Sequence, residues 1–402
     1  MSAAAASRLV TGLTGPSKLG TSEGDTRPLQ RTSRFAFELA ADADEVDIRR
    51  ILRTRALPGA VAMTFEREPH TALAASIEGD SHQAVIARDC VTGTIAGLAA
   101  RSARALFVNG EPTRVGYLGQ LRITNRRHGL RTLIDEGFAF LKTLHQDAAT
   151  PAYLLSLIAG NSAARRLLID RRSATAPRFV AVGDLHTFVI PTRNGRRRTG
   201  AHIHVEQGSP DRLAEIAACL QRNVRRYQFA PRWTVSDLES GEATRGLKPE
   251  DFAIAVAGGQ IVGCLALWDQ RAFKQVVVRG YTPAVRRTRL LINAASPLLG
   301  LPRLPAIGNR LEFAYLSHTA IDDDRGDVLS ALIAEQIRRA RLRGLDYVVA
   351  GFSADHPFHP VIQREFARRT YRSTLYVAHW DDGARFVESL DGRIPQPEVA
   401  VL

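Results

Sequence analysis

The sequence predicts an α/β protein made of two tandem domains, each with a mixed central β-sheet flanked by helices. Three observations support this fold class. The chain has 402 residues, which is too many for one hydrophobic core of the usual size. Alternating apolar segments, typical of strands, are interleaved with segments whose apolar residues recur at helical spacing. The two halves also repeat the same order of predicted elements, which indicates a duplicated unit.

The sequence of the first half predicts eight strands and helices. In order they are a strand at 34–40, a helix within 42–57 with Asp42 or Asp44 as N-cap, a hairpin at 82–103 turning through 89–93, a strand at 113–124, a helix from Leu130, a buried strand at 152–159 and a short helix opening at Asn161.

The second half predicts a matching series of elements. They are a strand, turn and helix within 205–227, a hairpin at 251–269 with its turn at Gly258 and Gly259, a strand at 311–321, a helical stripe at 329–337, and strands at 346–352 and 372–380. Compared with the first half, about 30 residues are inserted, within 273–310. The expected organisation is a disordered tail at 1–33, a first domain at 34–192, a basic linker at 193–200 and a second domain at 201–402.

Composition bounds the class of protein. The formal net charge is +13, which suits an anionic partner such as nucleic acid, a membrane surface or a phosphorylated cofactor. No run approaches the roughly 20 apolar residues that a membrane-spanning helix needs. Cys90, Cys219 and Cys264 are scattered without metal-ligand spacing, so we expect no disulfide framework and no metal, as in a reducing cytoplasm. The excess of Arg over Lys is typical of GC-rich bacterial genomes.

A basic segment separates the strand ending near Thr124 from the helix beginning at Leu130. It contains Arg126, Arg127, His128 and Gly129. A helix N-terminus exposes unpaired N–H groups and a partial positive charge, and a preceding loop that supplies further N–H groups makes an anion site. Glycine lets the backbone approach the anion closely, and arginines add charged donors. The pattern predicts a pyrophosphate-binding loop.

At these residues the chain resembles the GNAT superfamily of acyl-CoA-dependent N-acyltransferases. The family's Q/R-x-x-G-x-G/A loop, which holds the CoA pyrophosphate, would correspond to Arg126, Arg127, His128, Gly129, Leu130 and Arg131. The segment "GQLRIT" resembles the family's fourth strand, which implies that the backbone of Leu121, Arg122 and Ile123 flanks the acyl-pantetheine arm. The segment "NSAARRLL" resembles the helix after the fifth strand and would place Asn161 near the pantetheine.

The chain departs from the family at three positions. Arg131 replaces the last small residue of the loop, and Leu168 stands where many members have a tyrosine that acts as general acid. Gln120 stands where many have a glutamate base; glutamine takes no proton but can orient a water. Gln120 and Tyr117 are therefore the candidate catalytic residues, with His128 a weaker alternative, and proximity and backbone N–H groups would carry most of the catalysis.

The second half lacks the basic loop. Its equivalent turn carries Asp322, Asp323 and Asp324 before Gly326, which would repel a pyrophosphate, and we expect a solvated acidic turn there. We expect the segment around His356 and His359 to be an extended structural loop without a metal.

The resemblance implies transfer of an acyl group, expected to be acetyl, from one acyl-CoA per chain to an amine whose identity is open. Two alternatives stand beside this function: a CoA-binding sensor or scaffold without catalysis, and a nucleic-acid-binding protein. The second is disfavoured because no reading motif is present and the charge is not clustered with aromatic residues.

Overall fold

A computed structural model describes residues 30–31, 34–57, 59–124, 129–146, 150–171, 173–193, 203–299 and 303–402. Three of the predicted cofactor-binding residues, Arg126, Arg127 and His128, lie outside the described residues, as do most of the expected tail and linker. Gln30 and Arg31 form a short strand, β1, paired with the next strand, so regular structure begins before the predicted boundary at residue 33.

The first half follows the predicted order, with two additional elements between the first helix and the hairpin. Its elements are β1 (Gln30–Arg31), β2 (Phe35–Leu39), α1 (Glu45–Thr54), β3 (Val61–Glu66), α2 (Thr71–Glu78), β4 (Ser81–Asp89), β5 (Ile95–Val108), β6 (Glu111–Ile123), α3 (Leu130–Gln146), β7 (Tyr153–Ile158), α4 (Ser162–Leu168) and β8 (Arg178–Pro191). Sequence reasoning missed four of these elements: β1, β3, α2 and β8.

The second half repeats the series. Its elements are β9 (His204–Gln207), α5 (Leu213–Val224), β10 (Ala230–Pro231), α6 (Val235–Ser240), β11 (Phe252–Ala257), β12 (Gln260–Trp268), β13 (Gln275–Tyr281), α7 (Pro283–Leu299), β14 (Phe313–Ile321), α8 (Gly326–Leu342), β15 (Tyr347–Ser353), α9 (Phe358–Glu365), β16 (Arg369–His379) and α10 (Ala384–Glu388). Among the described helices, none is both long and apolar enough to cross a membrane.

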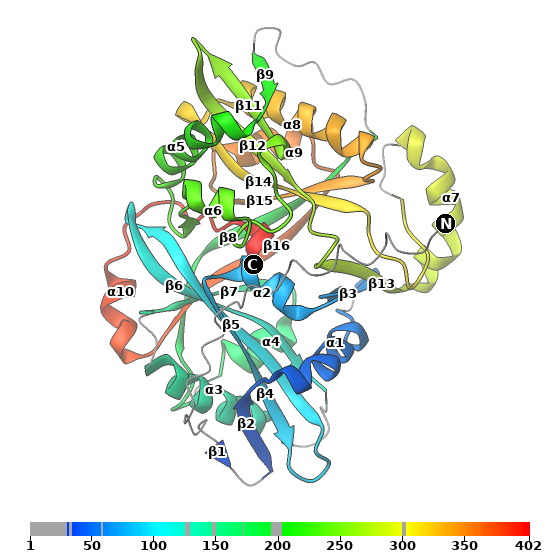
Figure 1. Ribbon diagram of the computed structural model, residues 1–402. Coiled ribbons are helices and arrows are strands. Elements are labelled where there is room, and N and C mark those ends of the chain that lie inside the picture. The colour runs from blue at the N-terminus through cyan, green and yellow to red at the C-terminus, as the bar shows by residue number, and fades with distance from the viewer. Residues whose placement is uncertain are drawn as a thin grey trace, which may run out of the picture.

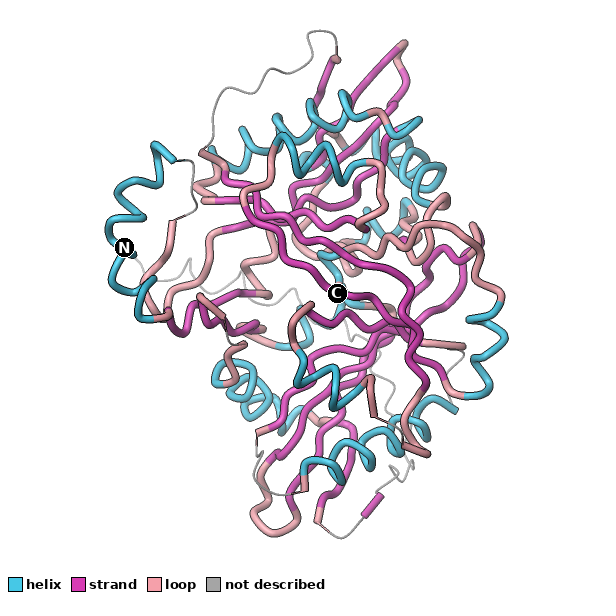
Figure 2. The backbone as a smooth tube through the Cα atoms, turned by 180° about the vertical axis from the view of Figure 1, so that it is seen from behind, coloured by secondary structure: helices cyan, strands magenta, loops and turns pink. Residues whose placement is uncertain are grey.

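One continuous mixed sheet runs through both halves (Figures 1 and 2). Its strand order is β1-β2-β4-β5-β6-β7-β16-β8-β15-β14-β12-β11-β9, with β10 attached to β5. The last strands are exchanged between halves: β16 of the second half pairs with β7 of the first, and β8 of the first pairs with β15 of the second. The two predicted units are therefore joined through their central strands and not only by a linker.

The predicted insertion is confirmed. In the first half β5 leads directly into β6, whereas in the second β13 and α7 come between β12 and β14. Strand β13 leaves the main sheet and pairs antiparallel with β3, forming a separate two-stranded ribbon. Helix α7 projects beside this ribbon at the side of the molecule (Figure 1).

The helices cover apolar faces of the sheet in the way their sequence periodicity predicts. Phe37 of β2 packs with Leu133 and Phe140 of α3, all of them buried. In the second half, Leu329 and Leu332 of α8 face the equivalent strands. Full burial of such a side chain stabilises the fold by about 1.5–3 kcal/mol, so these contacts fix α3 and α8 against their strands.

Asp44 is the N-cap residue of α1, as predicted, but it makes no capping bond. Its carboxylate instead accepts hydrogen bonds from the Ala41 N–H at 2.9 Å and from Arg88 at 2.7 Å. The prediction of an extended segment around His356 is wrong, because Pro357 has helical dihedral angles and stands at the N-cap position of α9. Proline is tolerated there since the first helical N–H groups have no intrahelical acceptor.

Candidate active site

Strands β6 and β7 run parallel and are paired only between the middle of β6 and the start of β7. Gly116 and Tyr117 of β6 lie opposite Tyr153 and Leu154 of β7, and the described strands share no further pairs. A Cβ at Gly116 would lie 2.1 Å from the ring of Tyr153, so only glycine allows this close approach. Beyond it the strands diverge and leave backbone N–H and C=O groups free to bind an extended ligand.

A β-bulge interrupts β6 inside this opening. Leu98 of β5 faces Arg122, and Ala100 faces Gly119, so Gln120 and Leu121 together face a single residue of β5. Gln120 takes a positive φ of 56°, a conformation that residues other than glycine seldom adopt. Bulges of this kind re-aim side chains and are common beside active sites.

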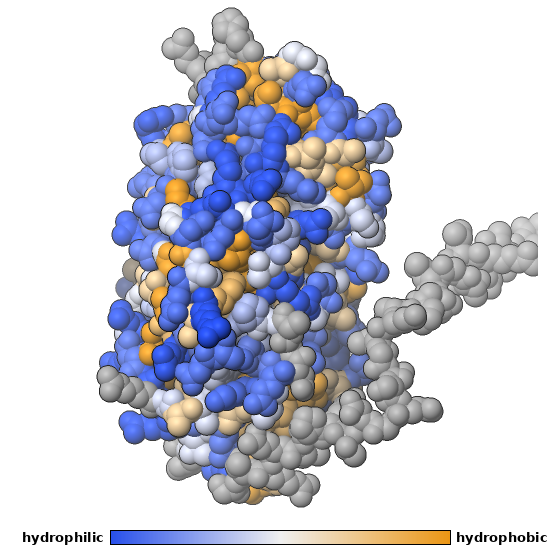
Figure 3. All heavy atoms as spheres, turned by 90° about the vertical axis from the view of Figure 1, so that its left-hand side faces the viewer, coloured by the Kyte–Doolittle hydropathy of each residue, from blue (hydrophilic) through white to orange (hydrophobic). Residues whose placement is uncertain are grey.

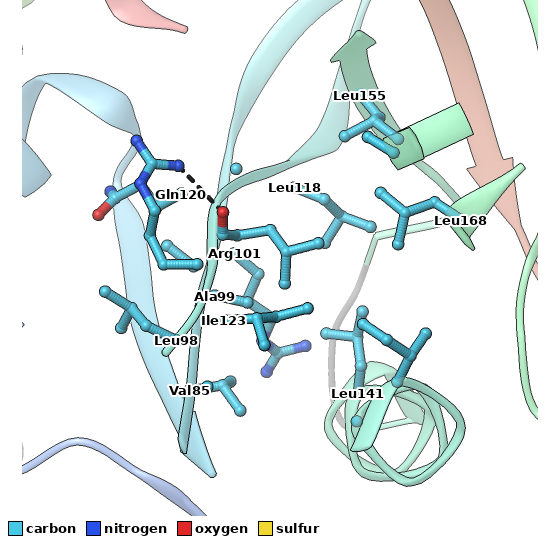
Figure 4. Close-up of a pocket in the computed structure, with 18 of the residues that line it drawn as sticks. Val85, Leu98, Ala99, Arg101, Leu118, Gln120, Ile123, Leu141, Leu155 and Leu168 are labelled. Atoms are coloured by element: carbon cyan, nitrogen blue, oxygen red, sulfur yellow. Dashed lines mark hydrogen bonds between the residues drawn. The ribbon is translucent and has the colours of Figure 1, made fainter. Parts of the chain in front are cut away.

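A cavity of about 310 Å³ lies between the diverging strands and α3. Figure 4 shows Leu118, Leu155 and Leu168 around it, contributed by β6, β7 and α4, with Leu141 on α3 below. All three predicted strand residues, Leu121, Arg122 and Ile123, line it, as do the following apolar residues from five neighbouring elements: Phe37, Val85, Leu98, Leu133, Ile134, Phe138 and Phe179. The cavity therefore suits a long ligand with an apolar portion.

The N-terminus of α3 opens at the mouth of this cleft. Gly129 has a φ of +69°, and its carbonyl accepts the first described bond of the helix, from the N–H of Leu133 at 2.8 Å. Arg131 is exposed and does not crowd the loop, and its carbonyl accepts a hydrogen bond from Arg171. Leu130 begins the helix. Arg171 also forms an ion pair with Asp135 on the second turn, and the exposed Arg131 lies on the first turn, whose N–H groups have no intrahelical acceptor.

Asn161 lies at the edge of the cavity and caps α4. Its side-chain oxygen accepts a hydrogen bond from the N–H of Ala164 at 3.1 Å, so it holds the helix start that faces the cleft. Leu168, where the family often carries a tyrosine, is buried in the cavity wall. No proton donor stands at that position.

A buried group of charged side chains lies beside the bulge. Glu78, from the end of α2, forms an ion pair with Arg67 and accepts a hydrogen bond from Gln120 Nε2 at 3.1 Å. His82 Nε2 lies 3.2 Å from the same carboxylate. Burial alone would raise the pKa of Glu78, but the charge of Arg67 and the His82 hydrogen bond outweigh it and hold the pKa below its usual range. Glu78 is therefore ionised at neutral pH.

Two further titratable groups border this cluster. Burial, followed by the nearby charge of Glu78, raises the pKa of Tyr117, which lines the cleft. Tyr117 therefore keeps its proton at neutral pH. Burial lowers the pKa of Lys274 to about 8, and its ammonium donates to the carbonyl of Ala400 at 3.1 Å.

Sequence reasoning found Gln120 and Tyr117 but missed the charged partners around them. Arg67 and Glu78 are 11 residues apart on different elements, and Lys274 belongs to the other half. A signal for Glu78 exists in hindsight, because it ends a helix that is otherwise made of small and apolar residues. A charge at such a position needs a buried partner, but the sequence does not show which one.

The second half carries the same bulge but no open cleft. His318 and Thr319 together face one residue of β12, and His318 has a φ of +53°. The chain from Gln396 onward fills the gap between β14 and β15: Gln396 bonds the backbone of Ser353 and Gly351, and Val399 packs so closely that a Cβ on Gly351 would lie 1.9 Å away. A space of about 40 Å³ remains.

The acidic turn of the second half is solvated only in part, which corrects the expectation. Asp322 accepts hydrogen bonds from Arg222 and Asn223, and Asp324 from Arg226 and Tyr227. These bonds tie the turn before α8 to α5 and the residues that follow it. Asp323 between them is exposed. Within the described residues no group of three or more possible metal ligands is present.

The continuous sheet, the repeated bulge and the single open cleft define a tandem GNAT fold, the fold shared with acyl-CoA-dependent N-acyltransferases. The predicted resemblance and fold class are thereby confirmed. The chain matches Saccharomyces cerevisiae N-myristoyltransferase with bound myristoyl-CoA at a TM-score of 0.55 and 13% identity, over 88% of this chain and 85% of that one. A second structure of that enzyme with myristoyl-CoA gives 0.57 and 12%, over 88% and 81%.

A third match is the GCN5-related glucosamine N-acetyltransferase region of a fungal multi-domain GH3 β-N-acetylglucosaminidase. Its TM-score is 0.56 at 14% identity, over 88% of this chain and 38% of that one. No protein-family model and no curated protein matches the sequence. At these identities the matches establish the fold, and the reaction must be argued from the site.

Proposed function

We propose that this protein is an acyl-CoA-dependent N-acyltransferase that binds acyl-CoA between β6 and β7. The observation that carries the proposal is the meeting of two environments at the bulge of Gln120. On one side lies a mostly apolar cavity that opens towards the N-terminus of α3. On the other side lie Glu78 and its partners, between the two halves. The apolar cavity suits an acyl chain, and the carboxylate of Glu78 suits a positively charged amine.

In this proposal the CoA pyrophosphate binds at Gly129, with Arg126, Arg127 and His128 of the preceding loop and with Arg131. The pantetheine arm follows the unpaired edge of β6 at Leu121, Arg122 and Ile123, and passes Asn161. The thioester carbonyl then lies at the bulge, where backbone N–H groups polarise it.

The acceptor enters from the charged side as an ammonium ion attracted by Glu78. His82, whose Nε2 lies 3.2 Å from the Glu78 carboxylate, is placed to take its proton, since an imidazole is a common proton acceptor in catalysis. The neutral amine attacks the thioester carbon, the new C–N bond forms and the C–S bond breaks. Tyr117, which is protonated at neutral pH, gives its proton to the leaving thiolate and takes the remaining proton of the attacking nitrogen, so that the amide and the free thiol are released. Gln120 holds the amine or a water beside Glu78.

The acyl group was expected to be acetyl, but the cavity wall favours a longer chain. Its inner part is formed by apolar side chains of three elements, among them Val85, Phe138 and Leu141, and an acetyl group would leave this surface uncovered. A comparison of kcat/KM for acetyl-, octanoyl- and myristoyl-CoA tests this. We expect kcat/KM to rise with chain length, and a maximum at acetyl-CoA would contradict the longer-chain proposal.

Release of CoA thiol from acyl-CoA, measured against a panel of amines with mass spectrometry of the product, tests the N-acyltransferase function. We expect an acylated amine to form in stoichiometric amount with the thiol. Tight acyl-CoA binding without turnover on any amine would favour the sensor or scaffold alternative. Salt-dependent retention on DNA without acyl-CoA binding would favour the nucleic-acid alternative.

A further inference from the structure

Helix α7 and the loop after it form an arm that stands apart from the main sheet. On its inner face Ser296 is buried, Val285 and Ile292 are half-buried, and Asn293 makes two hydrogen bonds with the backbone of Leu304, which join the helix to its loop. The loop is held to the ribbon by the hydroxyl of Tyr281 in β13, which donates to the carbonyl of Pro305 at 2.7 Å. The arm belongs to the insertion in the second half and contributes no residue to the cavity. It therefore needs an explanation other than acyl-CoA binding.

The outward face of α7 exposes large apolar side chains. Leu290 and Leu291 are 71% and 72% exposed, and Ala294, one turn after Leu290, is exposed as well. Ile307, in the loop beside the helix, is 53% exposed. Single exposed leucines are ordinary, but adjacent ones on the free side of a projecting helix form an apolar patch.

The same arm is strongly basic. Together with strand β13, the arm spans residues 275–311, which contain six arginines and no acidic residue, although the chain as a whole has 41 Asp and Glu in 402 residues. Arg279 and Arg310 are paired with Glu66 and Glu312. Arg286 and Arg287, exposed one turn before Leu290 and Leu291, have no acidic partner within the described part of the chain. By contrast, the side of the molecule opposite α7 is largely hydrophilic, with only small apolar patches (Figure 3).

We propose that the outward face of α7, formed by Arg286, Arg287, Leu290, Leu291 and Ala294, docks the protein on an anionic membrane surface. Leucines on such a helix enter the boundary between headgroups and acyl chains, while arginines remain at the level of the lipid phosphates. The helix lies in the plane of the surface and does not cross it. This inference does not depend on the proposed acyltransferase activity.

Charge and chemistry select this occupant over others. A second copy docked through the same face would bring the arginines of both copies together. A nucleic acid would use the arginines but not the leucines, and the described part of α7 carries no aromatic side chain for base stacking. An anionic bilayer satisfies both the apolar and the charged residues.

Sedimentation with lipid vesicles tests the proposal on the full chain. We expect binding to vesicles of phosphatidylcholine mixed with phosphatidylglycerol, little binding to phosphatidylcholine alone, and weakening as salt is raised. Each basic residue near such a surface strengthens binding by about fivefold, so Arg286→Gln with Arg287→Gln should weaken it by about 25-fold. Leu290→Ser with Leu291→Ser should also weaken it, with no change in the salt dependence.

A matched control is available on α8. Arg341 and Leu342 are exposed there, Leu342 to 75%, so Arg341→Gln with Leu342→Ser removes the same chemistry from another surface and should leave vesicle binding unchanged. All substituted residues are exposed, and unchanged thermal unfolding will confirm intact folding. The proposal is overturned if the wild type does not bind anionic vesicles, if the α7 variants bind as the wild type does, or if the same residues are required for RNA or an acidic protein instead.

Discussion

Gln120 and His318 occupy the same place in the two halves of the sheet. Each is a residue other than glycine with a positive φ, 56° and 53°, at a bulge in the strand before α3 or α8. Their surroundings differ: Gln120 lines the cavity and binds Glu78, whereas the ring of His318 packs on Trp233 with centroids 4.3 Å apart. The two halves thus share a β-bulge with a positive φ, but within the described residues only the first half has an open cleft beside it.

Substitutions at the start of α3 should weaken CoA binding. Gly129→Val places a β-branched residue at a φ of +69° and should distort the loop that approaches the pyrophosphate. Arg126→Ala removes a charged donor, a loss of roughly 1.5–3 kcal/mol, which corresponds to about 10- to 100-fold in affinity. Titration calorimetry with CoA measures both.

Gly241 provides the matched control for backbone strain. It has a φ of +67° at the end of α6 in the second half, with no atom near its missing Cβ. Gly241→Val should lower stability about as much as Gly129→Val but leave CoA affinity unchanged. Equal losses of affinity in both variants would show that strain, and not the loop, is responsible.

Changes at Gln120 should separate catalysis from cofactor binding. Gln120→Leu removes the hydrogen bond to Glu78 and should lower kcat with little change in CoA affinity. Gln120→Glu places a second carboxylate beside Glu78, so one of the pair should become harder to ionise. Its turnover should fall at neutral pH and partly recover at lower pH. A pH profile like that of the wild type would remove Gln120 from the site.

Two buried histidines should make the protein sensitive to acid. Burial lowers the pKa of His318 and of His356 to about 3, from an ordinary value of 6.5. Between these values the unfolded chain binds protons that the folded chain does not, so stability is full above pH 6.5 and declines as the pH falls. The slope should be about 1.4 kcal/mol per pH unit for each histidine. Urea unfolding across this range should show a shallower slope in His318→Phe.

Each chain should bind one acyl-CoA although both halves share the fold. In the second half Val399 packs on Gly351, and Asp322 and Asp324 are bound to Arg222 and Arg226, so neither space nor positive charge is available. Calorimetry should give a stoichiometry near one that is abolished by Gly129→Val. A stoichiometry near two, or a site lost only in Gly326→Val, would refute the asymmetry.

Local sequence patterns predicted most of the strands and helices, because the spacing of apolar residues and the capping residues are local features of the sequence. Period-two and helical spacing located β4 to β7 and α3, and Asn161 caps α4 as its position suggested. The exchange of β8 and β16 could not be predicted, since pairing between distant strands leaves no local signal.

The candidate site was predictable only where backbone dictates residue type. Gly129 follows from the requirements of an anion loop, and the strand at Leu121 to Ile123 follows from the family resemblance. The pairing of Glu78 with Arg67 and Gln120, by contrast, depends on contacts between segments that are separate in the sequence. Strand β3 leads directly into Arg67, and α2 ends with Glu78; the sequence analysis predicted neither element. The charged side of the site was therefore not predictable from the sequence.

A structure determined with a thioether analogue of a long-chain acyl-CoA would show whether acyl-CoA binds between β6 and β7. We expect one molecule per chain, with its pyrophosphate beside Gly129, its pantetheine between β6 and β7, and its acyl chain against Leu118 and Leu155 in the cavity. Ligand bound between β14 and β15, or on the surface with the cavity unfilled, would contradict this expectation.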